Sequence, residues 1–98
     1  MDIRRVIGTN VRKYRQAAGL SQEDLALRIE IFDQGYISGL EVGRRNPTAV
    51  TIGLLASALG VSAGQLFSTE GMNETWARGP IQLVSSRSRR QKISAGAK

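Results

Sequence analysis

The side chains in this sequence that could do chemistry are guanidinium, ammonium and amide groups, because the usual catalytic and metal-binding groups are missing. The 98 residues include no histidine and no cysteine. This composition removes the commonest general base, the commonest zinc ligand, thiolate metal sites and disulfides. The carboxylates are scattered, and no glycine-rich phosphate loop of the Walker or Rossmann pattern occurs. We therefore expect no enzyme, no metal and no other cofactor, and a function that consists of binding.

The charge balance favours a polyanionic partner, with nucleic acid first and an acidic membrane surface second. Fourteen Lys and Arg residues against eight Asp and Glu residues give a formal net charge of +6. Residues 1–67 have a net charge of only +2, and residues 68–98 have +4, most of it in the run RSRRQK at 87–92. A basic tail can also be a solvated chain end, so charge alone leaves both interpretations open for this segment.

The length and hydropathy of the chain predict one small domain away from the membrane. No apolar run approaches the roughly 18 residues that a membrane span needs, and the N-terminus lacks the apolar region of a signal peptide. We therefore expect a cytoplasmic protein without a membrane partner, associated with the nucleoid if the polyanion is DNA.

The elements that must position these basic and amide groups are five short helices within residues 1–67. From Ile3 to Ala18 the apolar residues recur every three or four positions, which is one helix face. Further starts are marked by Ser21, Asp33, Thr48 and Ser62, whose side chains are typical N-caps. Glycines at 19, 43 and 60 mark the ends. The predicted helices are residues 3–18, 22–29, 34–42, 49–59 and a single turn ending near 66–67.

The predicted fold class is all-α, because no part of residues 1–67 alternates with period 2 for long enough to form a sheet. We expect residues 1–67 to form a compact five-helix domain, with residues 68–98 as a basic C-terminal extension. Residues 76–84 have enough apolar character to form an arm that docks locally. Residues 85–98 have nothing to bury and are expected to be a flexible tail.

The helices at 22–29 and 34–42 have the order of a helix-turn-helix, whose second helix enters a DNA major groove. Four segments carry a further signal, in the order IGTNVRKYR (7–15), GLSQEDLA (19–26), YISGLEVGRRNP (36–47) and LASALGVS (55–62). With these segments the sequence resembles the phage-repressor and Cro-like helix-turn-helix proteins, the XRE family, over nearly all of residues 3–67. The resemblance implies a repressor-like fold and a sequence-specific double-stranded DNA-binding transcriptional regulator.

The resemblance implies roles for four residues of this motif. Gln22 matches a glutamine that holds a phosphate at the start of the first motif helix. Gln34 matches the first recognition-helix position, where a glutamine can make a bidentate pair with adenine N6 and N7. Tyr36 aligns with a position near the sugar-phosphate backbone, and Ser38 lies on the groove-facing side. The alternative is that the glutamines are solvated polar residues and that Tyr36 is half buried.

Gly35 and Gly39 occupy positions where the family usually has base-reading side chains. Each glycine costs a helix interior about 1 kcal/mol relative to alanine. One explanation is that the helix backbone approaches the groove closely and DNA shape supplies specificity. The other is that packing of Ile37 and Leu40 fixes the helix in spite of the glycines. Both explanations predict sparse direct readout and a dependence on dimerisation.

Basic residues beyond this helix complete the predicted DNA-binding set. The resemblance places phosphate contacts at Arg44, Arg45 and Asn46, and guanidinium groups suit phosphate oxygens. Arg12, on the exposed face of the first helix, is a further candidate. For each arginine the alternative is a solvated surface charge.

Two structural features accompany the motif. The family pairs an arginine matching Arg15 with a glutamate matching Glu41, which implies a partly buried ion pair between the first helix and the recognition helix. The turn at 27–33 is one residue longer than the usual spacing and lacks the usual glycine. We expect residues 30–31 to absorb the extra residue while Asp33 still caps the recognition helix.

Apolar residues in the fourth helix predict a partner surface. Val50 and Leu54 lie off the stripe that faces the core, and with Val61 and Leu66 they are expected to form a two-fold interface. Such a homodimer would present two recognition helices about 34 Å apart on a palindromic operator. Alternatively, the segment around residues 76–84 covers this surface. A repressor-like regulator is the leading function, and the alternative is a DNA-binding antitoxin whose residues 68–98 bind a toxin partner.

Overall fold

A computed structural model describes residues 2–30 and 33–72, and this part of the chain is entirely helical. The fold class predicted from the sequence is confirmed. The arm predicted at 76–84 and the tail predicted at 85–98 lie outside the described residues. The helices are α1 (Ile3–Ala17), α2 (Gln22–Ile29), α3 (Gln34–Glu41), α4 (Ala49–Leu59) and α5 (Ala63–Leu66).

The predicted N-caps start their helices as expected. The Ser21 and Ser62 side chains accept bonds from the third backbone N–H of α2 and α5, and both form complete capping boxes. Asp33 accepts from the N–H of Tyr36 at 2.9 Å, and Thr48 caps α4. The sequence analysis missed the cap of α1, which is Asp2.

The helix ends differ from the predictions by one residue in two places. Helix α1 ends at Ala17 and α3 ends at Glu41, each one residue earlier than expected. After α3, Gly43 has a φ of 82°, a left-handed conformation that glycine adopts without strain. The chain therefore leaves α3 sharply and begins the segment that carries Arg44 and Arg45.

The elongated turn keeps its predicted cap. The C-cap of α2 is Glu30, whose φ of 66° is left-handed and unusual for a residue with a Cβ. Glu30 thus takes the backbone conformation for which glycine would be preferred. Asp33 caps α3 as predicted, while residues 31–32 lie outside the described part of the chain.

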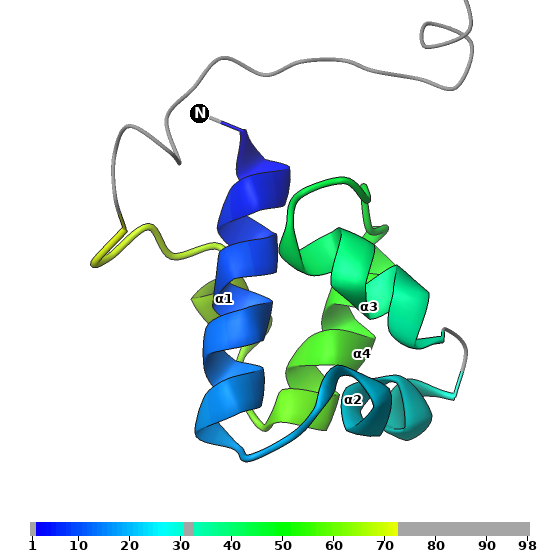
Figure 1. The fold of residues 1–98 in the computed structure, drawn as a ribbon. Helices are drawn as coiled ribbons and strands as arrows, with labels where there is room; N and C mark the ends of the chain where they lie inside the picture. The colour runs from blue at the N-terminus through cyan, green and yellow to red at the C-terminus, as the bar shows by residue number, and fades with distance from the viewer. Residues whose placement is uncertain (1, 31–32, 73–98) are drawn as a thin grey trace, which may run out of the picture.

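All five of the described helices contribute to the core: α1 packs against α3, α4 and α5, and α2 packs against α3 and α4 (Figure 1). An added Cβ at Gly8 would clash with the backbone carbonyl of Leu40, so α1 and α3 approach closely there because residue 8 is glycine. The residues that share full burial and large side chains are Leu25, Ile37, Leu40, Leu55 and Leu66.

The burial of Leu66 corrects one predicted interface residue. Leu66 is 0% exposed, because α5 packs against α1 and α4 and directs this side chain into the core. Asn10 of α1 fixes the same segment, since its buried Nδ2 donates to the carbonyl oxygens of Leu66 and Ser68 at 2.9 and 2.8 Å. Leu66 therefore stabilises the monomer, and its assignment to a dimer interface was wrong.

Candidate nucleic-acid interface

The first residue of α3 is connected to the core by a chain of hydrogen bonds. Nε2 of Gln34 donates to Oε1 of Gln22 at 2.6 Å. Nε2 of Gln22 donates in turn to Oε1 of Glu41 at 3.0 Å. Because a carboxylate only accepts, these bonds set which atom of each amide faces which way. The bond to Gln22 uses one of the two N–H donors of Gln34, whose side chain is exposed at the end of the chain.

The chain ends at the predicted ion pair between Arg15 and Glu41, which is confirmed. Arg15 Nε lies 2.6 Å from Glu41 Oε2, and Nη2 lies 3.1 Å from Oε1, which makes the pair bidentate. The side chains are only 10% and 3% exposed. The hydrogen bond to Glu41 raises the pKa of Arg15 above its usual value, so the guanidinium stays charged. We call Gln34, Gln22, Glu41 and Arg15 the polar chain.

On the outer face of α3, a side chain from the segment after the helix packs against the helix. The guanidinium carbon of Arg45 lies 5.3 Å from the centroid of the Tyr36 ring, within cation–π range. Gly39 is buried although it lies on the helix face predicted to meet DNA, because the Arg45 side chain lies against it. A groove of about 490 Å³ is lined by Gly35, Gly39, Arg44 and Arg45. We call Gly39, Tyr36 and Arg45 the Arg45 site.

This arrangement corrects one explanation for the glycines. Gly35 is exposed, as a close approach of the backbone to a groove requires. At Gly39 the space is filled by a side chain from the following segment, so the backbone is not open there. Tyr36 is half buried, and this burial raises the pKa of its phenol, which stays neutral near pH 7 and can donate a hydrogen bond.

The remaining predicted contact residues are accessible. Arg44 and Asn46 are exposed beyond α3, Ser38 is half buried on α3, and Arg12 is exposed on α1. Their contacts with DNA stay predictions. Of the predicted interface residues other than Leu66, Val50 is 74% exposed, and Leu54 and Val61 are partly buried. They too stay candidates.

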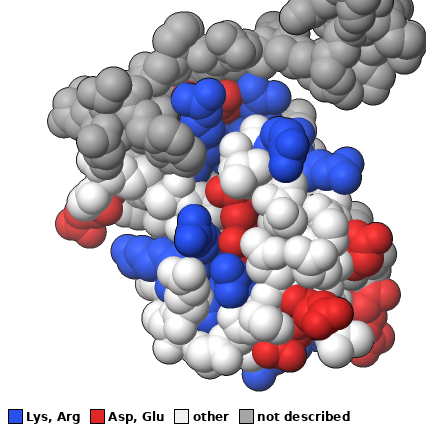
Figure 2. All heavy atoms as spheres, viewed as in Figure 1, with Lys and Arg blue, Asp and Glu red and all other residues white. Residues whose placement is uncertain are grey.

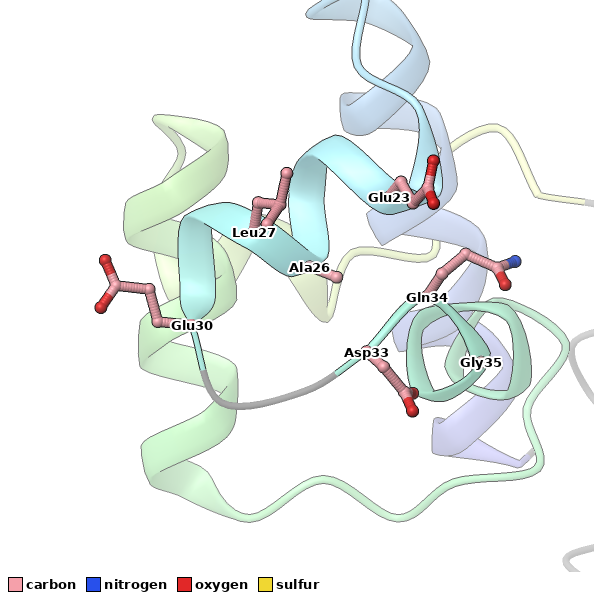
Figure 3. Close-up of a pocket in the computed structure, with 7 residues that line it drawn as sticks. All are labelled: Glu23, Ala26, Leu27, Glu30, Asp33, Gln34 and Gly35. Atoms are coloured by element: carbon pink, nitrogen blue, oxygen red, sulfur yellow. The ribbon is translucent and has the colours of Figure 1, made fainter.

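An acidic surface borders this region on one side. In Figure 2 the carboxylates gather at the lower right, over α2 and the start of α3 (compare Figure 1). A groove of about 800 Å³ lies there, and Figure 3 shows that its lining residues come from α2, the start of α3 and the two capping residues between these helices. It is lined by Glu23, Ala26, Leu27, Glu30, Asp33, Gln34 and Gly35, so it adjoins the first residues of α3. Its carboxylates repel phosphates, so the groove itself does not favour a DNA backbone.

The contacts that orient this interface were not predicted from the sequence. The bonds from Gln34 to Gln22 and from Gln22 to Glu41 join residues 12 and 19 positions apart, and no local pattern signals them. The contact of Arg45 with Gly39 had a weak signal, namely a glycine on the outer face of a helix that is soon followed by basic residues. Among the described residues no group of His, Cys, Asp or Glu could hold a metal ion, and no helix could span a membrane.

Comparisons with known proteins agree with this geometry. A helix-turn-helix family model matches residues 11–66. The uncharacterized HTH-type transcriptional regulator y4dJ of Sinorhizobium fredii is 48% identical over 66 residues, which cover 67% of this chain and 84% of that protein. The restriction-modification controller protein C.AhdI from Aeromonas hydrophila is 41% identical with a TM-score of 0.62, covering 65% of this chain and 96% of that one.

A third similar protein is known as a complex with DNA. The restriction-modification controller protein C.Esp1396I is a tetramer on its natural 35 base-pair operator. It is 33% identical to this chain with a TM-score of 0.61, and the match covers 68% of this chain and 87% of that one.

Proposed function

The chain belongs to the helix-turn-helix family of DNA-binding transcriptional regulators, and from this premise we propose that it is a sequence-specific, repressor-like homodimer that binds a palindromic operator. The observation that carries the proposal is the polar chain, which presents the exposed Gln34 amide at the start of α3 in a fixed orientation. Binding of chromosomal DNA would place the protein in the cytoplasm, at the nucleoid.

In the proposed complex α3 lies in the major groove. Gln34 accepts from adenine N6 through Oε1 and donates to N7 through the N–H that Gln22 does not use. Because Gln22 is the first residue of α2, its backbone N–H and those beside it face a phosphate at a helix N-terminus. Arg44, Asn46 and Arg12 supply further phosphate contacts, and Ser38 donates or accepts on the groove side.

We expect a dimer because the DNA-binding surface of one protomer is small. One α3 of eight residues with two glycines carries few base-reading side chains, so a second half-site is needed for useful specificity. Val50, Leu54 and Val61 offer the apolar surface for the partner. The similar protein C.Esp1396I binds its operator as a tetramer, which supports binding through several subunits.

The main experiment selects binding sites from random DNA and compares the affinity for a selected site with that for a scrambled one at moderate salt. A regulator should prefer its site by about 10³-fold or more. Gln34→Ala should reduce this preference, chiefly at one base pair in each half-site. A ratio near one for the wild-type chain would contradict the proposal.

The dimer has its own test with a matched control. Val50→Glu should shift the protein toward monomers in sedimentation experiments, because it places a charge in the interface. Leu27→Glu changes an equally exposed apolar residue, 73% against 74%, on a helix outside that surface. Equal behaviour of the two variants would speak against this interface. The antitoxin alternative depends on residues 68–98, of which 73–98 lie outside the described part, and it stays untested.

A further inference from the structure

The outer face of α3 has a vacancy that a loop side chain fills. A Cβ built onto Gly39 would lie 3.2 Å from Nε and 3.4 Å from Cγ of Arg45. The contact at 3.2 Å is tighter than most real Cβ contacts, so a side chain at position 39 would require Arg45 to shift by a few tenths of an ångström or more. One turn earlier, a Cβ on Gly35 would meet only Oδ1 of Asp33, at 3.4 Å. Of these two glycines, only Gly39 therefore makes room for Arg45.

The Tyr36 ring restrains Arg45 from another side. The guanidinium carbon lies 5.3 Å from the ring centroid, yet Arg45 remains exposed to solvent. A long side chain normally loses much rotamer freedom when it binds. Here part of this cost is met before DNA arrives, because Gly39 and Tyr36 already restrict the side chain. Such pre-organisation suits a contact that requires a defined direction.

We propose that Arg45 reads a guanine in the major groove, presented on the outer face of α3 by the vacancy at Gly39 and the ring of Tyr36. The inference rests on the proposed function, which places this face in the groove. The two glycines remove the side chains that α3 itself would use there, and Arg45 takes their place from the segment after the helix. A guanidinium group can donate two parallel bonds to guanine O6 and N7.

A phosphate contact from the same side chain is the competing role, and the two differ in what they change. A phosphate contact adds affinity for every sequence, whereas a base contact adds it for one base pair. Lysine can replace arginine as a positive charge beside phosphate but cannot reproduce the bidentate fork. Position 39 separates the two roles further, because Gly39→Ala moves Arg45 without changing the charge of the protein.

The experiment measures binding of full-length variants to the selected site and to a panel in which each base pair is changed singly. The wild type should lose about 5- to 150-fold on one G·C change per half-site through loss of the Arg45 contact. Arg45→Lys should abolish this preference, and Gly39→Ala should weaken it because the added Cβ shifts Arg45. Both variants should keep the preference assigned to Gln34. Arg45→Lys that binds every member of the panel like the wild type would overturn the proposal.

Folding is checked by thermal unfolding of each variant. Alanine is the better helix former, so Gly39→Ala should keep or raise the melting temperature while its guanine preference weakens. Gly64→Ala is the matched control, an exposed helical glycine outside the interface whose added Cβ meets only Ser62 Oγ at 3.8 Å. Gly64→Ala should bind the whole panel like the wild type. Gly35→Ala should retain the guanine preference, whatever its overall affinity.

The outcomes distinguish this inference from the function on which it rests. A wild-type chain without any sequence preference would contradict the proposed regulator. Preferences that are present in the wild type and survive Gly39→Ala and Arg45→Lys unchanged would overturn only the role of Arg45.

Discussion

The two ends of α3 present a polar side chain by different physical means. At the first residue, Gln34 belongs to the helix itself and is oriented by hydrogen bonds that lead to a buried ion pair. At the other end, Arg45 comes from the segment after the helix and rests against a glycine and an aromatic ring. The first arrangement depends on donors, acceptors and charge, and the second depends on empty volume.

This difference implies that the two ends fail under different substitutions. Removing one partner of a buried polar chain leaves the others without a bond, which is costly. A Cβ added at Gly39 has only Arg45 side-chain atoms as its nearest neighbours, so it should shift Arg45 and leave the hydrogen bonds of the polar chain intact. The following predictions separate the two ends, beginning with the largest expected effect.

Glu41→Ala should have the largest effect, a loss of about 3–5 kcal/mol in the free energy of unfolding, because it leaves Arg15 charged and buried. Urea denaturation measures this loss. The double variant Arg15→Met/Glu41→Leu should lose less, since it removes both charges. Equal losses for the single and double variants would show that the ion pair does not act as a unit.

Gln22→Ala should reduce the base preference at the position of Gln34 by about 0.5–1.5 kcal/mol, because the Gln34 amide loses the bond that orients it. Gln22→Glu should act in the same direction, since a carboxylate cannot donate to Glu41. Binding to single-base variants of the operator measures both. The guanine preference assigned to Arg45 should persist, and its loss would mean that the two ends are coupled.

Arg44→Ala should weaken binding to all sequences to a similar extent. If Arg44 neutralises one phosphate, the slope of log affinity against log salt should become shallower by about 0.9 for each protomer. Titrations at several salt concentrations give this slope. A change in base preference without a change in slope would assign Arg44 to the groove instead.

The smallest expected effect is a change in how the stability of the fold depends on pH. Hydrogen bonds within the Ser21 capping box, first from the backbone N–H of Ser21, hold the pKa of Asp24 below its usual value. A carboxyl group with a lowered folded-state pKa contributes stability above its unfolded value of about 3.9, and this is lost as pH falls through the folded pKa.

Asp24→Asn should therefore flatten the loss of stability below about pH 4, the usual range of an aspartate. Thermal unfolding as a function of pH tests it. Because Asp24 caps the helix that carries Gln22, acid should weaken the Gln34 end of the interface before the Arg45 end. A pH profile identical to that of the wild type would show that the Ser21–Asp24 capping box does not contribute to the loss of stability in acid.

Much of the fold could be predicted from the sequence because the signals that start and end the helices are local. Ser21, Asp33, Thr48 and Ser62 each bond to a backbone N–H three residues along the chain, so their types and positions suffice. Leu66 was misassigned because periodicity shows that a residue is apolar and does not show which neighbour covers it. Gly39 was assigned to the side of α3 that faces DNA, which stays a prediction, and its contact with Arg45 was not foreseen.

The sequence by itself determined the helices, their caps and, through its resemblance to a known family, the motif that carries the amides and arginines. The tertiary structure decided how these side chains are presented. Gln22 contacts Glu41 because α2 packs across the end of α3, and Arg45 contacts Gly39 because Gly43 redirects the chain after α3. Both depend on how the backbones are arranged in space, and neighbouring residues in the sequence do not encode that arrangement.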